Sequence, residues 1–226
     1  MGDKINLALI GAGHWGKNLA RVFHELGILK TICESSKEIL LKEAAKYPKI
    51  NTTSSFAEVL ASPDINAIAI ATQAEQHYSL AKKSLLADKH VFVEKPLSMT
   101  AQEGEDLVKI AKRQEKVLFV GHILQYHSAV QTVKRMLHEG ELGKLQYIYS
   151  NRLNLGKIRR GENILWSFAP HDISVILSLV GEEPLDVTAT GTNILHPNIA
   201  DTTVTNMKFS SGIGAHIFVS WLHPFK

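Results

Sequence analysis

Apolar residues follow two alternating patterns along the first 121 positions. Short apolar runs, typical of buried strands, precede stretches with apolar residues every three or four positions, typical of helices. The expected strands are residues 5–10, 29–33, 50–53, 67–71, 90–93 and 117–121. The expected helices are residues 17–26, 36–47, a segment capped by Ser55, 76–87 and a segment from Thr100 to Gln114. This alternation predicts an α/β fold with a Rossmann-type doubly wound parallel sheet.

The pattern changes after residue 122, so we place a domain boundary there and expect domains at 1–122 and 123–226. Helices are expected at 126–138 and 171–180, and strands at 145–155, 185–192, 201–209 and 213–222. Consecutive strands joined by short turns predict an α+β domain with a mostly antiparallel open sheet. The last strand would be an open edge, so we expect the sheet to be completed by residues absent here or by a homo-oligomer.

Composition limits the classes of function. The chain has 226 residues, 45% hydrophobic and 21% charged, and a net charge of +3, too small to favour nucleic acid or an anionic membrane as a partner. No apolar run matches a signal peptide or the roughly 20 residues of a membrane span. Cys33 is the single cysteine, which excludes a disulfide framework and favours a reducing, cytoplasmic setting. No cluster has metal-ligand spacing, so we expect no metal.

A glycine-rich turn carries the clearest chemical signal. Gly11, Gly13 and Gly16 lie between the first strand and the first helix, the context that a dinucleotide-binding turn requires. They permit a tight turn, close approach of a pyrophosphate, and close helix–strand packing, while the helix N-terminus supplies N–H groups to the phosphates. We therefore expect this turn, with Ala12, His14 and Trp15, to contact the cofactor rather than to be a structural turn alone.

Glu34 ends the second strand, about 20 residues past the glycines. A carboxylate there accepts hydrogen bonds from a ribose 2′-hydroxyl and repels a 2′-phosphate, which favours NAD over NADP. Lys37 nearby offers a phosphate a cation, so the sequence leaves NADP open as the alternative.

Glu94-Lys95-Pro96 follows the strand at residues 90–93. The carboxyl edge of a parallel sheet is where open α/β folds bind ligands, and Pro96 restricts the backbone of Lys95. A surface lysine at a strand end is the plain alternative. The glycine turn earlier in the chain, separated from Lys95 by several strand–helix units, favours a functional role.

These features together resemble the glucose-fructose oxidoreductase / inositol dehydrogenase (Gfo/Idh/MocA) family. The marks of the resemblance are the glycine turn, Glu34, Ala71-Thr72 with His77, Glu94-Lys95-Pro96, Gly121-His122 and His171. The resemblance implies an NAD(P)-dependent dehydrogenase acting on a CH–OH group. It also implies that Thr72, His77 and Glu94 lie near the cofactor, and that roughly the last third of the family's second domain is absent from this chain.

A narrower resemblance lies in residues 152–172 and in Gln125-Tyr126-His127. These segments are similar to the branch, related to WlbA, that oxidises the 3-hydroxyl of UDP-linked N-acetylated sugars or their uronic acids. The broader family often has an aspartate four residues before the catalytic histidine, where this chain has Ser167. The difference argues against an inositol-dehydrogenase type of proton relay.

The predicted chemistry is hydride transfer from a sugar hydroxyl to a nicotinamide. His171, expected at a helix start after Pro170, is the candidate base, because the helix dipole there would keep its ring neutral. Lys95 would bond the same substrate oxygen, and the two roles are exchangeable because a desolvated lysine also serves as a base. A core histidine that caps a helix is the plain alternative for His171.

Substrate contacts are expected from the polar loop after residue 151. Arginine offers fork-shaped donors to a diphosphate or carboxylate, and asparagine binds sugar hydroxyls. The predicted substrate contacts are Lys95, Tyr126, Arg152, Asn154, Arg159, Asn163 and His171, with Lys157 and Arg160 in the same loop.

Two other functions stay open: a dehydrogenase for a free sugar or cyclitol, and a non-catalytic NAD(P)-binding regulator or remnant.

Overall fold

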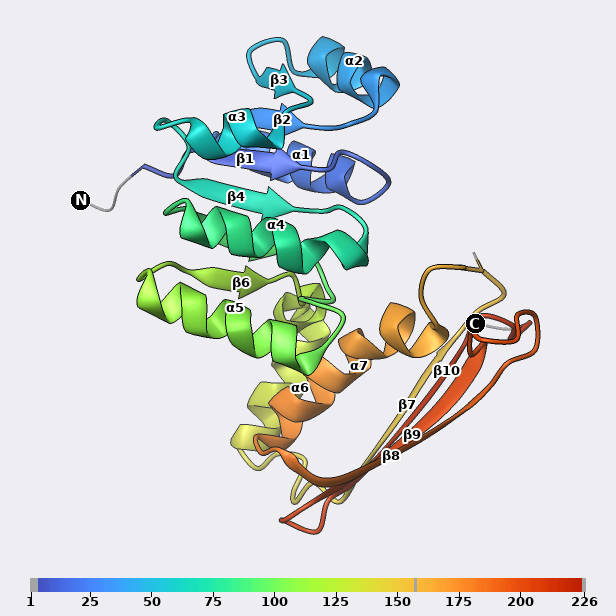
Figure 1. Ribbon diagram of the computed structural model, residues 1–226. Coiled ribbons are helices and arrows are strands. Elements are labelled where there is room, and N and C mark those ends of the chain that lie inside the picture. Colours follow the sequence, from blue (N-terminus) through green and yellow to red (C-terminus); the bar gives the residue numbers. More distant parts are fainter. Residues whose placement is uncertain (1–3, 157, 225–226) are drawn as a thin grey trace. The chain divides into compact units, whose positions relative to one another are not determined.

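The computed structural model describes residues 4–156 and 158–224 and divides into two compact units, residues 1–121 and 122–226 (Figure 1). The first unit has one sheet with an apolar core on each of its faces, and the second unit has its own sheet and a single apolar core. Within the described residues, no helix combines the length and the apolarity that crossing a bilayer requires. The two units are separate folds, because no strand of one sheet pairs with a strand of the other within the described residues.

The first unit is built around a six-stranded sheet of order β3-β2-β1-β4-β5-β6, in which every pairing is parallel. Its strands are β1 (Leu7–Ile10), β2 (Leu29–Cys33), β3 (Asn51–Thr53), β4 (Ala67–Ile70), β5 (His90–Val93) and β6 (Leu118–Val120). Its helices are α1 (Gly16–Glu25), α2 (Lys37–Lys46), α3 (Phe56–Ala61), α4 (Ala74–Leu86) and α5 (Ala101–Arg113). The predicted doubly wound sheet is confirmed.

The central strands of this sheet are buried on both faces. In β1, Ala8 and Ile10 belong to the core under α4 and α5, whereas Leu7 and Leu9 belong to the core that includes Ala20 of α1. Two-sided burial explains why the strands read as continuous apolar runs rather than alternating ones.

Side-chain caps set three helix starts in the first unit. Ser36 and Ser55 accept hydrogen bonds from backbone N–H groups at the starts of α2 and α3. Thr100 forms a capping box with Glu103 at the start of α5. Ser36 was expected inside a helix but lies just before it, because its hydroxyl replaces the missing backbone partner of Ile39.

The second unit contains a four-stranded sheet of order β7-β10-β9-β8. Its elements are η1 (Ile123–Tyr126), α6 (Ser128–His138), β7 (Tyr147–Leu153), α7 (Ile164–Val180), β8 (Pro184–Thr192), β9 (Thr202–Phe209) and β10 (Gly214–Ser220). The β8–β9 and β9–β10 pairs are antiparallel, as predicted, whereas β7 pairs with β10 in parallel. The expected α+β unit with a mostly antiparallel sheet is therefore confirmed. The last strand, β10, was expected at an open edge, but it lies between β7 and β9, because β7 pairs with it across the chain.

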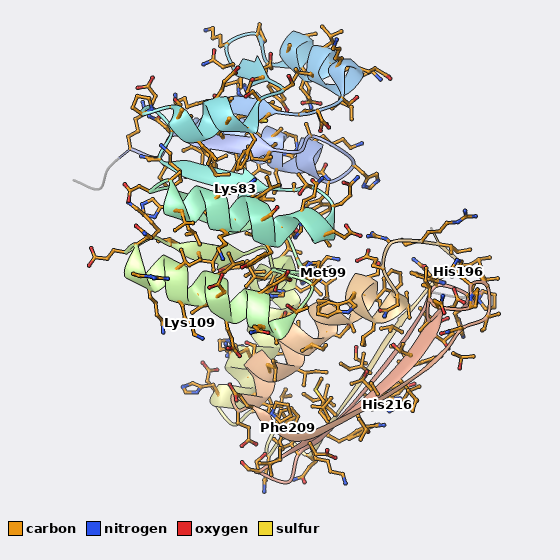
Figure 2. The ribbon with its side chains drawn as sticks, in the orientation of Figure 1. Lys83, Met99, Lys109, His196, Phe209 and His216 are labelled. Atoms are coloured by element: carbon orange, nitrogen blue, oxygen red, sulfur yellow. The ribbon has the colours of Figure 1, made fainter. Side chains whose placement is uncertain are left out.

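One face of this sheet packs against α7, and residues of the other face are exposed. Phe209 is 4% exposed in the core with α7, and Figure 2 labels it at the end of β9. His216 of β10 stacks on Tyr149 of β7, with ring centroids 5.4 Å apart, and Tyr149 is 59% exposed. Aromatic groups therefore lie on the solvent side of a sheet whose other side is a filled core.

Helix α7 corrects one expectation. The sequence predicted a helix from His171, whereas α7 begins at Ile164, is capped by Asn163 and contains Pro170 in its interior. A proline inside a helix removes one hydrogen bond, which made residue 170 resemble a boundary. Complete burial of Ile164 and Ala169 against the sheet outweighs that local cost.

Candidate functional site

The glycine turn joins β1 to α1 through residues 11–16. Gly11 has a φ of +88°, and a Cβ on it would lie 2.8 Å from the Ala71 carbonyl oxygen. A Cβ on Gly16 would lie only 2.0 Å from the Gly11 carbonyl oxygen. Packing within the turn therefore requires both of these glycines.

Gly13 differs from its neighbours, because a Cβ there would meet no heavy atom within 4 Å. Packing within the unit therefore does not explain a glycine at this position. The open space lies beside the first turn of α1, where no side chain caps the helix. A bare glycine backbone at the positive end of a helix dipole fits a pyrophosphate, so the turn fits NAD.

Glu34 follows β2 and reaches back to the glycine turn. Its Oε2 accepts a hydrogen bond of 2.8 Å from the Ala12 N–H, and its Oε1 accepts one of 3.0 Å from the Ser36 N–H. Burial raises the pKa of the carboxyl, but these hydrogen bonds and those from Ser35 lower it more, so the net pKa lies below its usual value. Glu34 is therefore a fixed anion at the edge of the turn.

The sheet order aligns the predicted cofactor residues along one edge. Glu34, the glycine turn, Thr72 and Glu94-Lys95 follow β2, β1, β4 and β5, which are neighbours in that order. Connections from β1 and β4 leave the sheet in opposite directions, which is the topological switch point where open α/β sheets bind ligands. Lys95 is half-buried at this edge, and its peptide bond to Pro96 is cis.

His77 on α4 is buried beneath this edge. Its Nδ1 lies 2.7 Å from the Pro96 carbonyl oxygen, and its Nε2 lies 3.2 Å from the Thr72 carbonyl oxygen. The ring is 2% exposed, so the side chain contacts the two loops after β4 and β5 rather than the solvent. This geometry gives His77 a supporting position under the predicted cofactor contacts.

The predicted catalytic histidine, His171, lies in the middle of a helix. His171 occupies the eighth position of α7, so the prediction that it lies at a helix start, next to the positive end of the helix dipole, is wrong. Ser167 lies one turn earlier on the same helix and is buried. The residue that replaces the family's frequent aspartate is therefore on the same face of α7 as His171.

Arg152 is held by a carboxylate of its own unit. Its Nε lies 2.7 Å from Oδ2 of Asp172 and its Nη2 lies 3.1 Å from Oδ1, a two-point contact. The Ser150 hydroxyl donates to the same Oδ1 at 2.8 Å. Sequence reasoning named Arg152 as a phosphate contact and missed this pairing, because the partners are 20 residues apart with no local signal.

The other predicted substrate residues are spread along the second unit. Arg159 forms an ion pair with Glu162, and the Asn163 carboxamide oxygen caps α7 by accepting from the Trp166 N–H. Asn154 lies against Gly156, and Tyr126 is 68% exposed at the end of η1. Lys157 lies outside the described residues. The capping role explains Asn163 without any ligand.

Across residues 4–156 and 158–224, no three His, Cys, Asp or Glu side chains are grouped to hold a metal ion. Cys33 is buried, and burial beside Glu34 and Glu58 raises the pKa of its thiol to about 11, which keeps it protonated.

Comparison with known proteins adds to this geometry. The chain is 27% identical over 213 residues to a UDP-N-acetylglucosamine 3-dehydrogenase of Acidithiobacillus ferrooxidans, covering 94% of this chain and 66% of that protein. It is 23% identical over 202 residues to an inositol 2-dehydrogenase of Rhizobium meliloti, covering 87% of this chain and 61% of that protein. The chain thus spans less than two thirds of the length of either relative.

A solved structure shares the fold. The crystal structure of GenD2 from gentamicin A biosynthesis, in complex with NAD, superposes with a TM-score of 0.91 at 20% identity, covering all of this chain and 68% of that one. Residues 5–122 match the family described as "Oxidoreductase family, NAD-binding Rossmann fold", and residues 130–226 match the GFO/IDH/MocA C-terminal domain. The chain therefore belongs to the GFO/IDH/MocA oxidoreductase family, and its first unit is an NAD-binding Rossmann fold.

Proposed function

We propose that this protein is a dehydrogenase that transfers a hydride from a secondary hydroxyl of a sugar to NAD. The observation that carries the proposal is the row of Glu34, the glycine turn and Lys95 along one edge of the first sheet. Along this row, the dinucleotide site and the Lys95 ammonium at the end of β5 lie on the same edge of the sheet. NAD, when bound, supplies the hydride acceptor.

Lys95 and His171 are the proposed catalytic pair. A hydroxyl that loses hydride must also lose its proton, and an imidazole accepts a proton in the working pH range. An ammonium that bonds the same oxygen stabilises the negative charge that develops there. Because His171 lies inside α7, the dipole of a helix N-terminus does not act on it, and Lys95 remains the alternative base.

The proposed substrate is a UDP-linked N-acetylated hexose or hexuronic acid, oxidised at C3. Its support is the relative named UDP-N-acetylglucosamine 3-dehydrogenase and the polar residues Tyr126 and Asn154. Glu34 supports NAD over NADP, because its carboxylate accepts hydrogen bonds and repels a phosphate.

A free sugar or cyclitol is the second candidate substrate. The ion pairs of Arg152 with Asp172 and of Arg159 with Glu162 favour it, because they occupy two of the donors assigned to a diphosphate. The relative named inositol 2-dehydrogenase supports the same alternative.

The decisive experiment follows NADH absorbance with UDP-sugars and with free polyols. We expect turnover with UDP-sugars, and turnover with free polyols alone would select the second candidate. Lys95→Ala and His171→Ala should each lower kcat by about 100-fold while NAD still binds. Lys109→Ala, in an exposed position on α5, is the matched control. NAD binding without turnover of any sugar would identify a non-catalytic regulator.

The proposed assembly is a homo-oligomer through the exposed face of the second sheet. Tyr147 is 58% exposed and Tyr149 is 59% exposed, two positions apart on β7, and Tyr149 stacks on His216 of β10. Exposed aromatic side chains gathered on one sheet face favour association. Light scattering should show more than one chain per particle, and Tyr149→Lys should dissociate it.

A further inference from the structure

Trp15 occupies the glycine turn but contacts a residue far along the chain. Its indole Nε1 donates a hydrogen bond of 2.7 Å to Oε1 of Glu94, which is 79 residues away. Trp15 precedes the first residue of α1, yet its side chain makes no capping bond there. The ring is 41% exposed, so burial in the core does not explain a large aromatic residue at this position.

Two neighbours confine Glu94. The Trp15 indole donates a hydrogen bond to its Oε1, and the backbone of Gly121 lies close to the carboxylate. A Cβ on Gly121 would lie 3.0 Å from Oε1 and 3.1 Å from Oε2, closer than ordinary van der Waals contact. Burial raises the pKa of Glu94, and the Trp15 hydrogen bond and Lys95 only partly oppose the rise. The carboxylate is therefore a desolvated acceptor with a set position.

The sheet order shows where this acceptor lies relative to a dinucleotide. The pyrophosphate site is at β1, and Glu34 at the end of β2 marks the adenosine side. The other nucleoside must then extend in the opposite direction, over the ends of β4 and β5. The Trp15–Glu94 bond spans this same path, from the turn after β1 to the end of β5.

We propose that Trp15 is a positioning residue for the nicotinamide half of NAD. Its N–H fixes the Glu94 carboxylate to accept hydrogen bonds from the ribose hydroxyls of that half, and Gly121 leaves the space that the carboxylate occupies. Because Lys95 is the next residue, the same contact fixes the start of the loop that carries it. The inference rests on the NAD site of the proposed function and assigns it two residues, Trp15 and Gly121, that have no direct chemical role.

The test compares NAD with ADP, which has the adenosine and pyrophosphate but lacks the nicotinamide half. Calorimetry without any sugar measures both affinities in the wild type and in Trp15→Phe, which keeps an aromatic ring and removes the N–H. We expect the Kd for NAD to rise about tenfold and the Kd for ADP to change by less than about twofold. An equal rise in the Kd for NAD and the Kd for ADP would show that Trp15 supports the turn itself. No change in either Kd would show that the hydrogen bond from Trp15 to Glu94 does not affect cofactor binding. Both results would overturn the proposal.

Gly121→Ala places a methyl group against the same carboxylate. It should reproduce the selective loss of NAD affinity, and combining it with Trp15→Phe should cost less than the sum of the two single effects. Gly214→Ala is the matched control, because its Cβ would meet only Tyr147 at an ordinary 3.5 Å. Unchanged ADP binding shows that each variant is folded. Absence of sugar turnover in the wild type would defeat the proposed function yet leave the NAD-to-ADP comparison intact.

Discussion

Arg152 on β7 and Asp172 on α7 form a two-point ion pair, with N–O distances of 2.7 and 3.1 Å. Asp172 is 8% exposed and adjacent in sequence to His171. The pair therefore sets the rotation of α7 about its axis at the position of the proposed base. A residue that the sequence presented as a substrate ligand is part of the scaffold of the site.

Arg152→Ala should lower the free energy of unfolding by about 2 kcal/mol, because it leaves a buried carboxylate without its main partner. Arg21→Ala breaks an exposed pair with Glu25 and should cost less than about 0.5 kcal/mol. Urea unfolding measures both. If Arg152→Ala keeps wild-type stability and only raises KM for a UDP-sugar, Arg152 is a substrate ligand instead.

Gly13→Ala and Gly16→Ala should separate binding from folding. A Cβ on Gly13 meets open space, so this variant should keep its melting temperature and bind NAD at least about tenfold more weakly. A Cβ on Gly16 would lie 2.0 Å from a carbonyl oxygen, so that variant should unfold at a lower temperature, by several degrees or more. Thermal melts with and without NAD measure both effects. Unaltered NAD affinity in Gly13→Ala would remove the pyrophosphate from this turn.

Glu34→Ala should weaken NAD more than NADP, because it removes both an acceptor for a ribose hydroxyl and a charge that repels a 2′-phosphate. Burial raises the pKa of Glu34, but hydrogen bonds lower it more, so the net pKa lies below its usual value and the carboxylate is charged at neutral pH. The NAD preference of the wild type should therefore stay constant between about pH 6 and 8. Fluorescence titration with each cofactor tests this, with the exposed Glu38→Ala as the control. Equal losses for the two cofactors would contradict the assignment.

Asp201 should make the second unit sensitive to acid. Its buried carboxylate accepts hydrogen bonds from the Ile194 and Leu195 N–H groups, both at 2.7 Å, and from the Trp221 indole at 2.6 Å. Burial raises the pKa of Asp201, but these bonds lower it more, so the folded-state pKa lies below the unfolded one. The stability it contributes is therefore present above the unfolded pKa of about 3.9 and is lost as pH falls through the folded pKa.

Asp201→Asn should consequently lose stability at pH 7 and show a shallower decline between about pH 5 and 3. Urea midpoints at several pH values measure this slope, and Asp64→Asn, at an exposed position, should leave it unchanged. A wild-type acid slope in Asp201→Asn would show that other carboxylates control the transition.

The order of strands and helices in the first unit was readable from the sequence alone, because each signal is local. Apolar runs mark strands that are buried on both faces, and caps such as Thr100 mark helix starts within a few residues. The glycine turn and Lys95 fell at the carboxyl edge because parallel strands bring their ends to one side. These features follow from backbone geometry and burial, which neighbouring residues largely determine.

Only the tertiary structure decided which distant side chains meet. The start of α7 at Ile164, the ion pair of Arg152 with Asp172, and the bond of Trp15 to Glu94 all depend on packing between elements far apart in the chain. A proline that signals a helix end locally is accepted inside α7 because buried apolar residues offset its cost. Hydrogen-bond partners in a desolvated site are selected by proximity in space, and the linear pattern of residues carries no record of that proximity.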